Sequence, residues 1–318
     1  VEIPSQDLLT KKLSLAVIPG RISEIVIVDN DISKWVLPFS EGDILNIRDV
    51  EQGLENIQRT PEVDVKINIV PGTKNGTSKL VINTQRKKIW SARASYNNYG
   101  DDSTGNQLIG GVGYLYNVTS LSDVFYLAGT GSQTGGYKNA SAYYSVPFGY
   151  NDLSLFYSKS KSTQGIDVGT YTFDYVGETE YFSLKGNRML YRNVNSKLSA
   201  SAEFIRRKYD YTLGGTELVL QKRDMGNIRL GLNYKRNFTG AALDSTLTWQ
   251  RFTRAFGGTD TPDMRTGTVS KKSQIVNLNV NYVKWLTMLP ANAYYELKFG
   301  AQYSPDNLTL QDQFTIGD

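Results

Sequence analysis

Apolar and polar residues follow two different periods along this chain, and the change falls near residue 88. Before it, short alternating segments flank one stretch with helical spacing. After it, long segments alternate with a period of two, which puts apolar side chains on one face of a strand and polar side chains on the other. The pattern predicts a small α+β domain followed by a large antiparallel β structure.

The clearest helix is predicted between Asn46 and Thr60. Asn46 can cap its first turn, and Asp49 adds negative charge there. Four apolar residues share one face, at Ile47, Val50, Leu54 and Ile57. We expect these four in the core of the small domain, with an exposed groove as the alternative. The other elements are a strand, one or two helical turns and two strands, at 25–28, 32–36, 63–69 and 79–84, which gives the order β-α-α-β-β.

The sequence predicts that the chain is divided into three segments. Residues 13–17 alternate as a strand and meet Pro19-Gly20, which cannot continue a ladder. A lone strand cannot fold by itself, so residues 1–18 are interpreted as the end of an upstream domain. The small domain then covers 19–86, and the strand-rich part covers 87–318.

Alternating segments fill most of the strand-rich part, at 89–99, 106–118, 122–132, 138–148, 152–162, 178–190, 196–212, 218–238, 240–255, 270–288 and 291–304. They exceed the usual strand of about 5 or 6 residues and match the length that crosses a bilayer at a tilt. Trp90, Trp249 and Trp285 are candidates for the aromatic belts at its interfaces. The pattern favours a transmembrane β-barrel. Eleven segments is an odd number, whereas single-chain barrels close with an even number, so either the count is wrong or the barrel is incomplete. A soluble β-sandwich alternates too and is the alternative.

A barrel of this kind has a polar interior. In the last two segments, polar residues alternate with apolar ones, as Asn277 does with Val276 and Leu278. The polar positions predicted to line a pore are Asn277, Asn279, Asn281, Glu296, Lys298 and Gln302.

Composition removes most enzymatic chemistry. The chain has no histidine and no cysteine, which excludes imidazole bases, thiolate nucleophiles and Cys/His zinc sites. It also lacks a G-x-x-x-x-G-K-[ST] loop for phosphates. Lys and Arg (35) are dispersed among nearly as many Asp and Glu (31), so no basic stripe points to nucleic acid. We expect a protein that is not an enzyme, with no cofactor, no metal and no nucleic-acid partner.

The run from Leu45 to Arg59 (LNIRDVEQGLENIQR), together with Val70-Pro71-Gly72, resembles the second POTRA domain of two-partner secretion transporters, the haemolysin secretion/activation protein family. The resemblance implies that 1–18 ends a first POTRA domain and that 19–86 is the second, in the periplasm. Residues 87–318 would supply about eleven strands of a sixteen-stranded outer-membrane barrel. The sixth extracellular loop would begin around Phe314, Ile316 and Gly317.

The resemblance also implies a function. A monomer in the outer-membrane lipid would bind the N-terminal secretion domain of a large exoprotein, a haemolysin, adhesin or contact-dependent toxin, and secrete it without nucleotide energy. Partner-binding candidates are Val63, Val65, Ile67, Ile69, Asp49 and Asn56. The strand 63–69 would dock its partner through a free edge, unless it is the central strand of the small sheet. Arg86-Lys87-Lys88 is expected at the membrane boundary.

Two other functions share parts of this pattern. An assembly factor that inserts other barrels also combines POTRA domains with a barrel. A soluble β-rich adhesin would need no membrane. The sequence does not identify the cargo.

Overall fold

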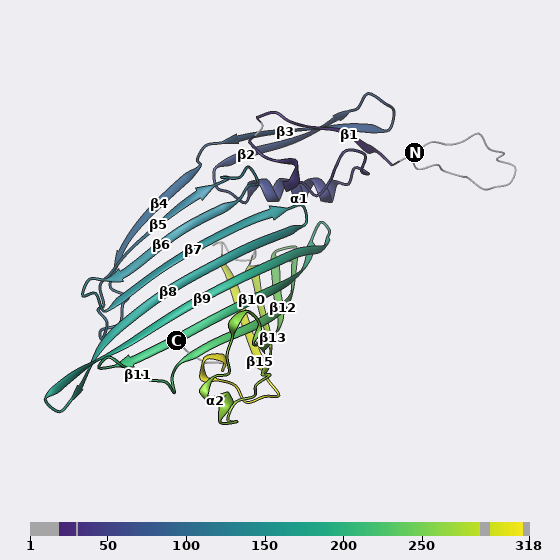
Figure 1. Cartoon of the computed structure of the whole chain (residues 1–318). Helices are drawn as coiled ribbons and strands as arrows, with labels where there is room; N and C mark the ends of the chain where they lie inside the picture. Colours follow the sequence, from purple (N-terminus) through teal and green to yellow (C-terminus); the bar gives the residue numbers. More distant parts are fainter. Residues whose placement is uncertain (1–18, 30, 287–292, 314–318) are drawn as a thin grey trace. The chain divides into compact units, whose positions relative to one another are not determined.

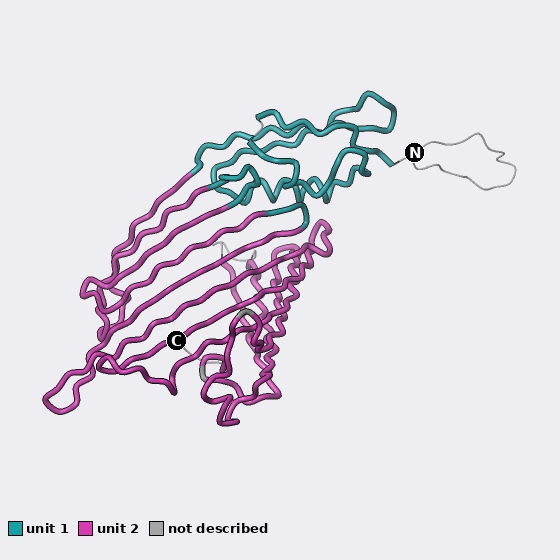
Figure 2. The backbone as a smooth tube through the Cα atoms, viewed as in Figure 1, with its two compact units in different colours: residues 1–89, 116–123, 147–150 teal, residues 90–115, 124–146, 151–318 magenta. Residues whose placement is uncertain are grey.

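The computed structural model describes residues 19–29, 31–286 and 293–313. These residues form two compact units, coloured separately in Figure 2. Unit 1 contains the chain up to Ile89 together with residues 116–123 and 147–150, and unit 2 contains the rest. The predicted upstream remnant, 1–18, and the predicted loop residues Phe314, Ile316 and Gly317 lie outside the described residues.

Unit 1 has the predicted element order, with a 3-10 turn as its first helix (Figure 1). Its elements are β1 (Arg21–Ile27), η2 (Lys34–Val36), α1 (Ile47–Gln58), β2 (Val63–Pro71) and β3 (Thr77–Arg86). The sheet order is β1-β3-β2, with β1 parallel and β2 antiparallel to β3. The central strand is therefore β3, and β2 is an edge strand.

Helix α1 begins where predicted, because the Asn46 side chain accepts a hydrogen bond from the Arg48 amide at 3.0 Å. Val50 and Ile57 are buried in the core of unit 1, and Leu54 packs against that core. Ile47 is 51% exposed, so the expectation that all four residues of this face are core was wrong at Ile47. Its first-turn position places it beyond the edge of the packed face.

A buried charged cluster joins three segments of unit 1. The Arg86 side chain is 5% exposed, and its Nε lies 3.5 Å from Asp31 Oδ2. Its Nη1 donates to Thr60 Oγ1 at 2.6 Å. Asp123, in the turn 116–123, is fully buried and also attracts the guanidinium. Asn117 of the same turn donates to the Asp31 carbonyl at 2.7 Å.

The expected membrane boundary at Arg86-Lys87-Lys88 is therefore wrong for its first residue. Arg86 is an internal residue that neutralises the partly buried Asp31 and the buried Asp123. Lys87 and Lys88 are exposed and pair with Asp64 at 2.8 Å and Glu62 at 2.6 Å. Hydrogen bonding to Lys87 lowers the pKa of Asp64.

Unit 2 is a single antiparallel sheet of twelve strands (Figure 1). One of these, β11 (Thr216–Glu217), pairs only with β10, which leaves eleven on the main path, the number predicted. The path follows the chain through β4 (Trp90–Asn97), β5 (Leu108–Tyr116), β6 (Val124–Ser132), β7 (Tyr137–Phe148), β8 (Asn151–Val168), β9 (Tyr171–Arg192), β10 (Ser196–Leu213), β12 (Arg223–Phe238), β13 (Ala241–Thr253), β14 (Gln274–Leu286) and β15 (Ala293–Tyr303). In the part of the chain that the structure describes, β4 and β15 are the terminal strands of this sheet.

Connections alternate between the two ends of the sheet because consecutive strands are antiparallel. One end has turns, including 116–123 and 147–150, which belong to unit 1. The other end has both short turns and long loops, the longest of them at 254–273. That loop contains α2 (Pro262–Arg265), whose Met264 packs with Met225 and Phe252. No helix in the described ranges is long and apolar enough to span a membrane.

Replacing Arg86 by Met tests the charged cluster. The substitution leaves Asp31 and Asp123 without their cation, and breaking a buried pair in this way costs about 3–5 kcal/mol. We expect the protection of β3 amides, measured by hydrogen exchange on the full chain, to fall accordingly. Lys88→Met is the control, because exposed ion pairs contribute little. Equal protection in the two variants would contradict a structural role for Arg86.

Candidate functional site

Among the described residues no strand pairs with the side of β2 that faces away from β3, and this free edge presents main-chain groups at alternate residues. The amide of Gly72 donates to Thr77 and the amide of Lys87 donates to Glu62, both at 2.9 Å. In the β2–β3 register these are the pairs 72:77 and 62:87, so even-numbered residues of β2 bond to β3. The odd-numbered residues turn their N–H and C=O groups to the free side. They are Val63, Val65, Ile67 and Ile69, together with Pro71, which has no N–H to offer.

Side chains hold this edge in place. Val63 and Val65 are buried in the core of unit 1, while Ile69 is 43% exposed. A strand that is anchored by its side chains and bare along its main chain is a template for pairing with another extended segment. The predicted docking residues on β2 thus share one geometric property, outward main-chain groups.

Asp49 and Asn56, the other partner-binding candidates, are engaged inside unit 1. Asn56 is 7% exposed, and its amide donates to the carbonyls of Val36 and Gly149, each at 2.7 Å. The Tyr150 hydroxyl donates to Asp49. Helix α1 therefore binds the turn 147–150. Sequence reasoning missed Gly149 and Tyr150 because the partners lie about a hundred positions apart in the chain.

Gly149 suits this contact for two reasons. Its φ is +56°, in the left-handed region that favours glycine. A Cβ there would also lie 3.3 Å from the Cα of Pro38, so a side chain would crowd the backbone that the turn approaches.

One face of unit 2 is polar. A hollow of about 710 Å³ on this face is lined by residues that include Lys185, Glu203 and Arg229. Arg229 donates to Glu203 at 3.2 Å and to Gln250 at 2.7 Å, and Ser183 donates to the same Glu203 carboxylate at 2.5 Å. We call this the polar face. In residues 19–313, within the described ranges, no group of acidic side chains is arranged to hold a metal ion.

The predicted pore-lining residues lie on the polar face. Thr246 and Thr248 line the hollow, and they pair with Asn279 and Asn277 of β14. These in turn pair with Gly300 and Gln302 of β15. Positions two apart on a strand share a face, so Asn281, Lys298 and Glu296 lie there as well. Their role in a pore stays a prediction.

The opposite face is apolar. It carries Leu230 and Leu247, 46% and 45% exposed, and Trp249, which is adjacent to Leu230 in the sheet. Further apolar residues of this face are Leu184, Phe204, Ile228, Leu232, Val276 and Leu278. We call this the apolar face. So large an apolar surface on a paired sheet suits contact with lipid.

In chain order, a small α+β domain is followed by a two-faced antiparallel sheet, which is the element order of POTRA-bearing membrane β-proteins. The POTRA domain family matches residues 21–71. The family described as "Haemolysin secretion/activation protein ShlB/FhaC/HecB" matches residues 76–318, well over half of the chain. The chain belongs to the haemolysin secretion/activation protein family.

Relatives extend the similarity to the whole chain. It is 30% identical over 326 aligned positions to "Outer membrane transporter CdiB-2" of Burkholderia pseudomallei, covering 100% of the chain and 56% of the relative. It is 25% identical to "Hemolysin transporter protein HpmB" of Proteus mirabilis, covering 96% and 56%. The solved structure of CdiB from Escherichia coli matches with a TM-score of 0.87 at 25% identity, covering 96% of the chain and 58% of that structure. The chain spans little more than half the length of these relatives.

Adjacent residues of β13 test the assignment of the two faces. Leu247→Arg puts a charge on the apolar face, which costs about 2–4 kcal/mol near the middle of a bilayer. Thr248→Arg puts the same charge on the polar face and is expected to be tolerated. Folding of the full-length protein into vesicles, followed by heat-dependent gel migration, measures the difference. Equal folding of both variants would contradict the lipid-facing assignment.

Proposed function

We propose that this protein is the outer-membrane transporter of a two-partner secretion system, which moves a large exoprotein outward without nucleotide energy. Unit 1 lies in the periplasm, and unit 2 forms part of the wall of a membrane channel. The observation that carries the proposal is the two-faced sheet of eleven long strands, whose apolar face suits lipid and whose polar face suits water. Family membership and relatives named outer membrane transporter support it.

Recognition of the exoprotein falls to the free edge of β2. An extended segment of its N-terminal secretion domain pairs with the outward main-chain groups of Val63, Val65, Ile67 and Ile69. Each hydrogen bond contributes about 0.5–1.5 kcal/mol net, so a few suffice for reversible docking. Asp49 and Asn56 support the site from α1 by fixing the turn 147–150.

The polar face provides the path. An unfolded chain in transit carries main-chain groups that need water or polar partners at every residue. Asparagines and charged residues along β10 to β15 give a hydrated wall for such groups, including Asn277, Asn279, Asn281, Glu296, Lys298 and Gln302. Transport of this kind depends on recognition of the exoprotein and on a water-filled channel through which it passes. The transporter works as a monomer that needs no cofactor and no nucleic acid, and it is not an enzyme.

The exoprotein is a haemolysin, an adhesin or a contact-dependent toxin. Relatives named CdiB and relatives named hemolysin transporter both match the chain, so the comparisons do not choose among these classes. An assembly factor that inserts other barrels is not favoured, because the matched family is the secretion family over 76–318.

Substitution of Ile69 tests docking through the strand edge. Ile69→Pro removes an outward N–H without touching a bond to β3, and we expect secretion of the cognate exoprotein by cells carrying the full-length gene to fall. Loss of one main-chain hydrogen bond corresponds to about 2- to 10-fold weaker binding.

Ile69→Ala is the matched control, since it removes the same side chain and keeps the N–H. Secretion is expected to remain near the wild-type level. Equal secretion by the proline and alanine variants, at equal amounts of folded transporter, would count against main-chain pairing at this edge.

A further inference from the structure

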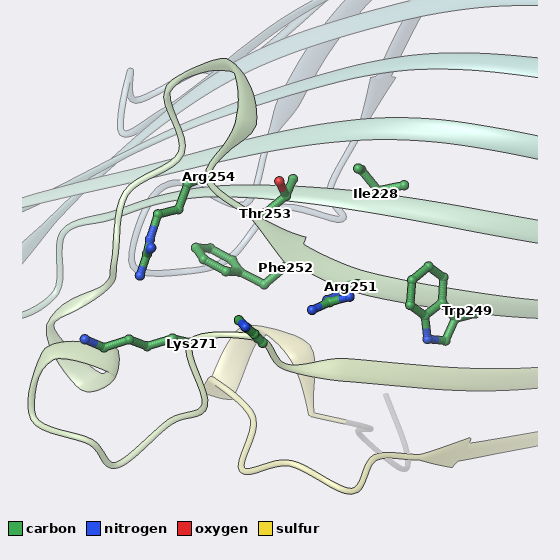
Figure 3. A pocket seen from close by; sticks show the side chains of 8 residues that line it. Ile228, Trp249, Arg251, Phe252, Thr253, Arg254 and Lys271 are labelled. Atoms are coloured by element: carbon green, nitrogen blue, oxygen red, sulfur yellow. The ribbon is translucent and has the colours of Figure 1, made fainter.

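A cationic groove lies on unit 2 where the apolar face meets the loop 254–273. Its volume is about 510 Å³, and its lining includes Ile228, Trp249, Arg251, Arg254, Lys271 and Lys272. Figure 3 shows Trp249 and Ile228 at one end, Arg254 and Lys271 at the other, and Arg251 between them. The groove therefore changes along its length from apolar to basic.

The strand register explains this gradient. Trp249 pairs with Leu230 and Val276, in a row of apolar residues. Arg251, two residues closer to the loop, lies on the same face. The Trp249 indole donates to Gln274 at 3.1 Å, so its polar edge also points toward the loop end. Trp, Tyr and basic residues take such positions where lipid meets its headgroup layer.

Positive charge exceeds negative charge in this groove. Four cations, Arg251, Arg254, Lys271 and Lys272, line it. The carboxylate of Asp260 pairs with Arg254 at 2.7 Å and with Lys271 at 3.6 Å. Among the residues that the structure describes, no acidic side chain pairs with Arg251 or Lys272. Four positive charges and one negative charge leave an excess of three.

Basic residues of β8 and β10 near the loop end of this face are neutralised. On β8, Lys159 pairs with Glu180 at 2.8 Å and Lys161 pairs with Glu178 at 3.0 Å. On β10, Arg206 makes two hydrogen bonds of 2.9 Å to the Asp224 carboxylate. Unpaired positive charge thus distinguishes the groove from the loop ends of β8 and β10.

We propose that this groove binds a phosphorylated, acylated sugar of the outer leaflet, a lipid of the lipid A type. A phosphate lies between Arg251 and Lys272, and acyl chains lie along Trp249 and Ile228. Guanidinium and ammonium groups bind phosphate through charge-assisted hydrogen bonds, and the apolar end selects a lipid over free phosphate. The outer leaflet follows from topology, because the turns 116–123 and 147–150 belong to unit 1 and the groove lies at the opposite ends of the strands. The inference rests on the membrane location given under the proposed function.

Native mass spectrometry of the detergent-solubilised full-length protein, titrated with purified lipid A, tests the assignment. Removing two cations in Arg251→Gln/Lys272→Gln is expected to weaken lipid A binding about 30-fold, from about 1 kcal/mol for each basic residue near an anionic lipid surface. Lys159→Gln/Lys161→Gln removes the same charge from paired positions on the same face and is expected to bind as the wild type does. Heat-dependent gel migration checks folding, and Lys272→Glu, an exposed single change, replaces the double variant if that does not fold.

Several outcomes would overturn the assignment. Equal binding by wild type and groove variant excludes the site, and equal losses in both double variants indicate a general charge effect. Displacement of lipid A by millimolar inorganic phosphate would make the groove a free-phosphate site. Secretion assays on the same strains separate the two proposals. A wild type that secretes its exoprotein but does not bind lipid A refutes only the lipid site, whereas a wild type that does not secrete refutes the proposed function.

Discussion

The ladder of main-chain hydrogen bonds between antiparallel neighbours is the constraint on which the rest of this structure depends. In hydrocarbon no water can bond to an unpaired N–H or C=O group, and each such group costs several kcal/mol. From β8 to β15 the described registers contain a single irregularity, between Leu198 and Ser199. Once the ladder fixes the main chain, each side chain must point to one face or the other. The apolar and polar faces are therefore a consequence of strand pairing. Alternation of apolar and polar residues along the sequence is enough to specify both faces of a strand.

In unit 1 the same main-chain groups are left unpaired along one strand edge. In the described part of the chain its ladder stops at β2, where alternate residues keep their main-chain groups unpaired on the free side. In water this costs little, because the groups are hydrated. Burial of Val63 and Val65 holds the strand in its extended form, so an incoming segment does not have to order it. An edge that would be intolerable in unit 2 is thus available for recognition in unit 1.

The periodicity of apolar and polar residues predicted most of the fold. The errors of this prediction have physical causes. The eleven strands of the main path were predicted from alternation, but β8 and β9 extend well beyond 152–162 and 178–190. Their additional residues, 163–168 and 171–177, pair with each other across the hairpin and include polar pairs such as Asp167 with Thr172, so the ladder continues where the apolar signal ends. The sequence pattern could predict that β2 is a strand with outward-facing main-chain groups. It could not predict that β2 lies at the edge of the sheet, because strand order depends on pairing between distant segments. Arg86 and Asn56 were misjudged or incompletely understood for the same reason, because their partners lie in turns far along the chain.

Basic residues at the loop end of the apolar face occur in two electrostatic environments, one with carboxylate partners and one without. On β8 to β10 each cation finds a carboxylate on a neighbouring strand, and such exposed pairs add little stability in water. These pairs make that part of the surface electrically neutral, so it does not attract a further negative charge. On β13 and β14 the cross-strand neighbours of Arg251 are Ile228 and Gln274, which carry no charge. The loop then adds Arg254, Lys271 and Lys272 to the groove, and the Asp260 carboxylate pairs with two of these cations, Arg254 and Lys271. Because the register fixes these neighbours, the adjacent strand positions give Arg251 no carboxylate, and a counter-charge must come from a loop or from a ligand.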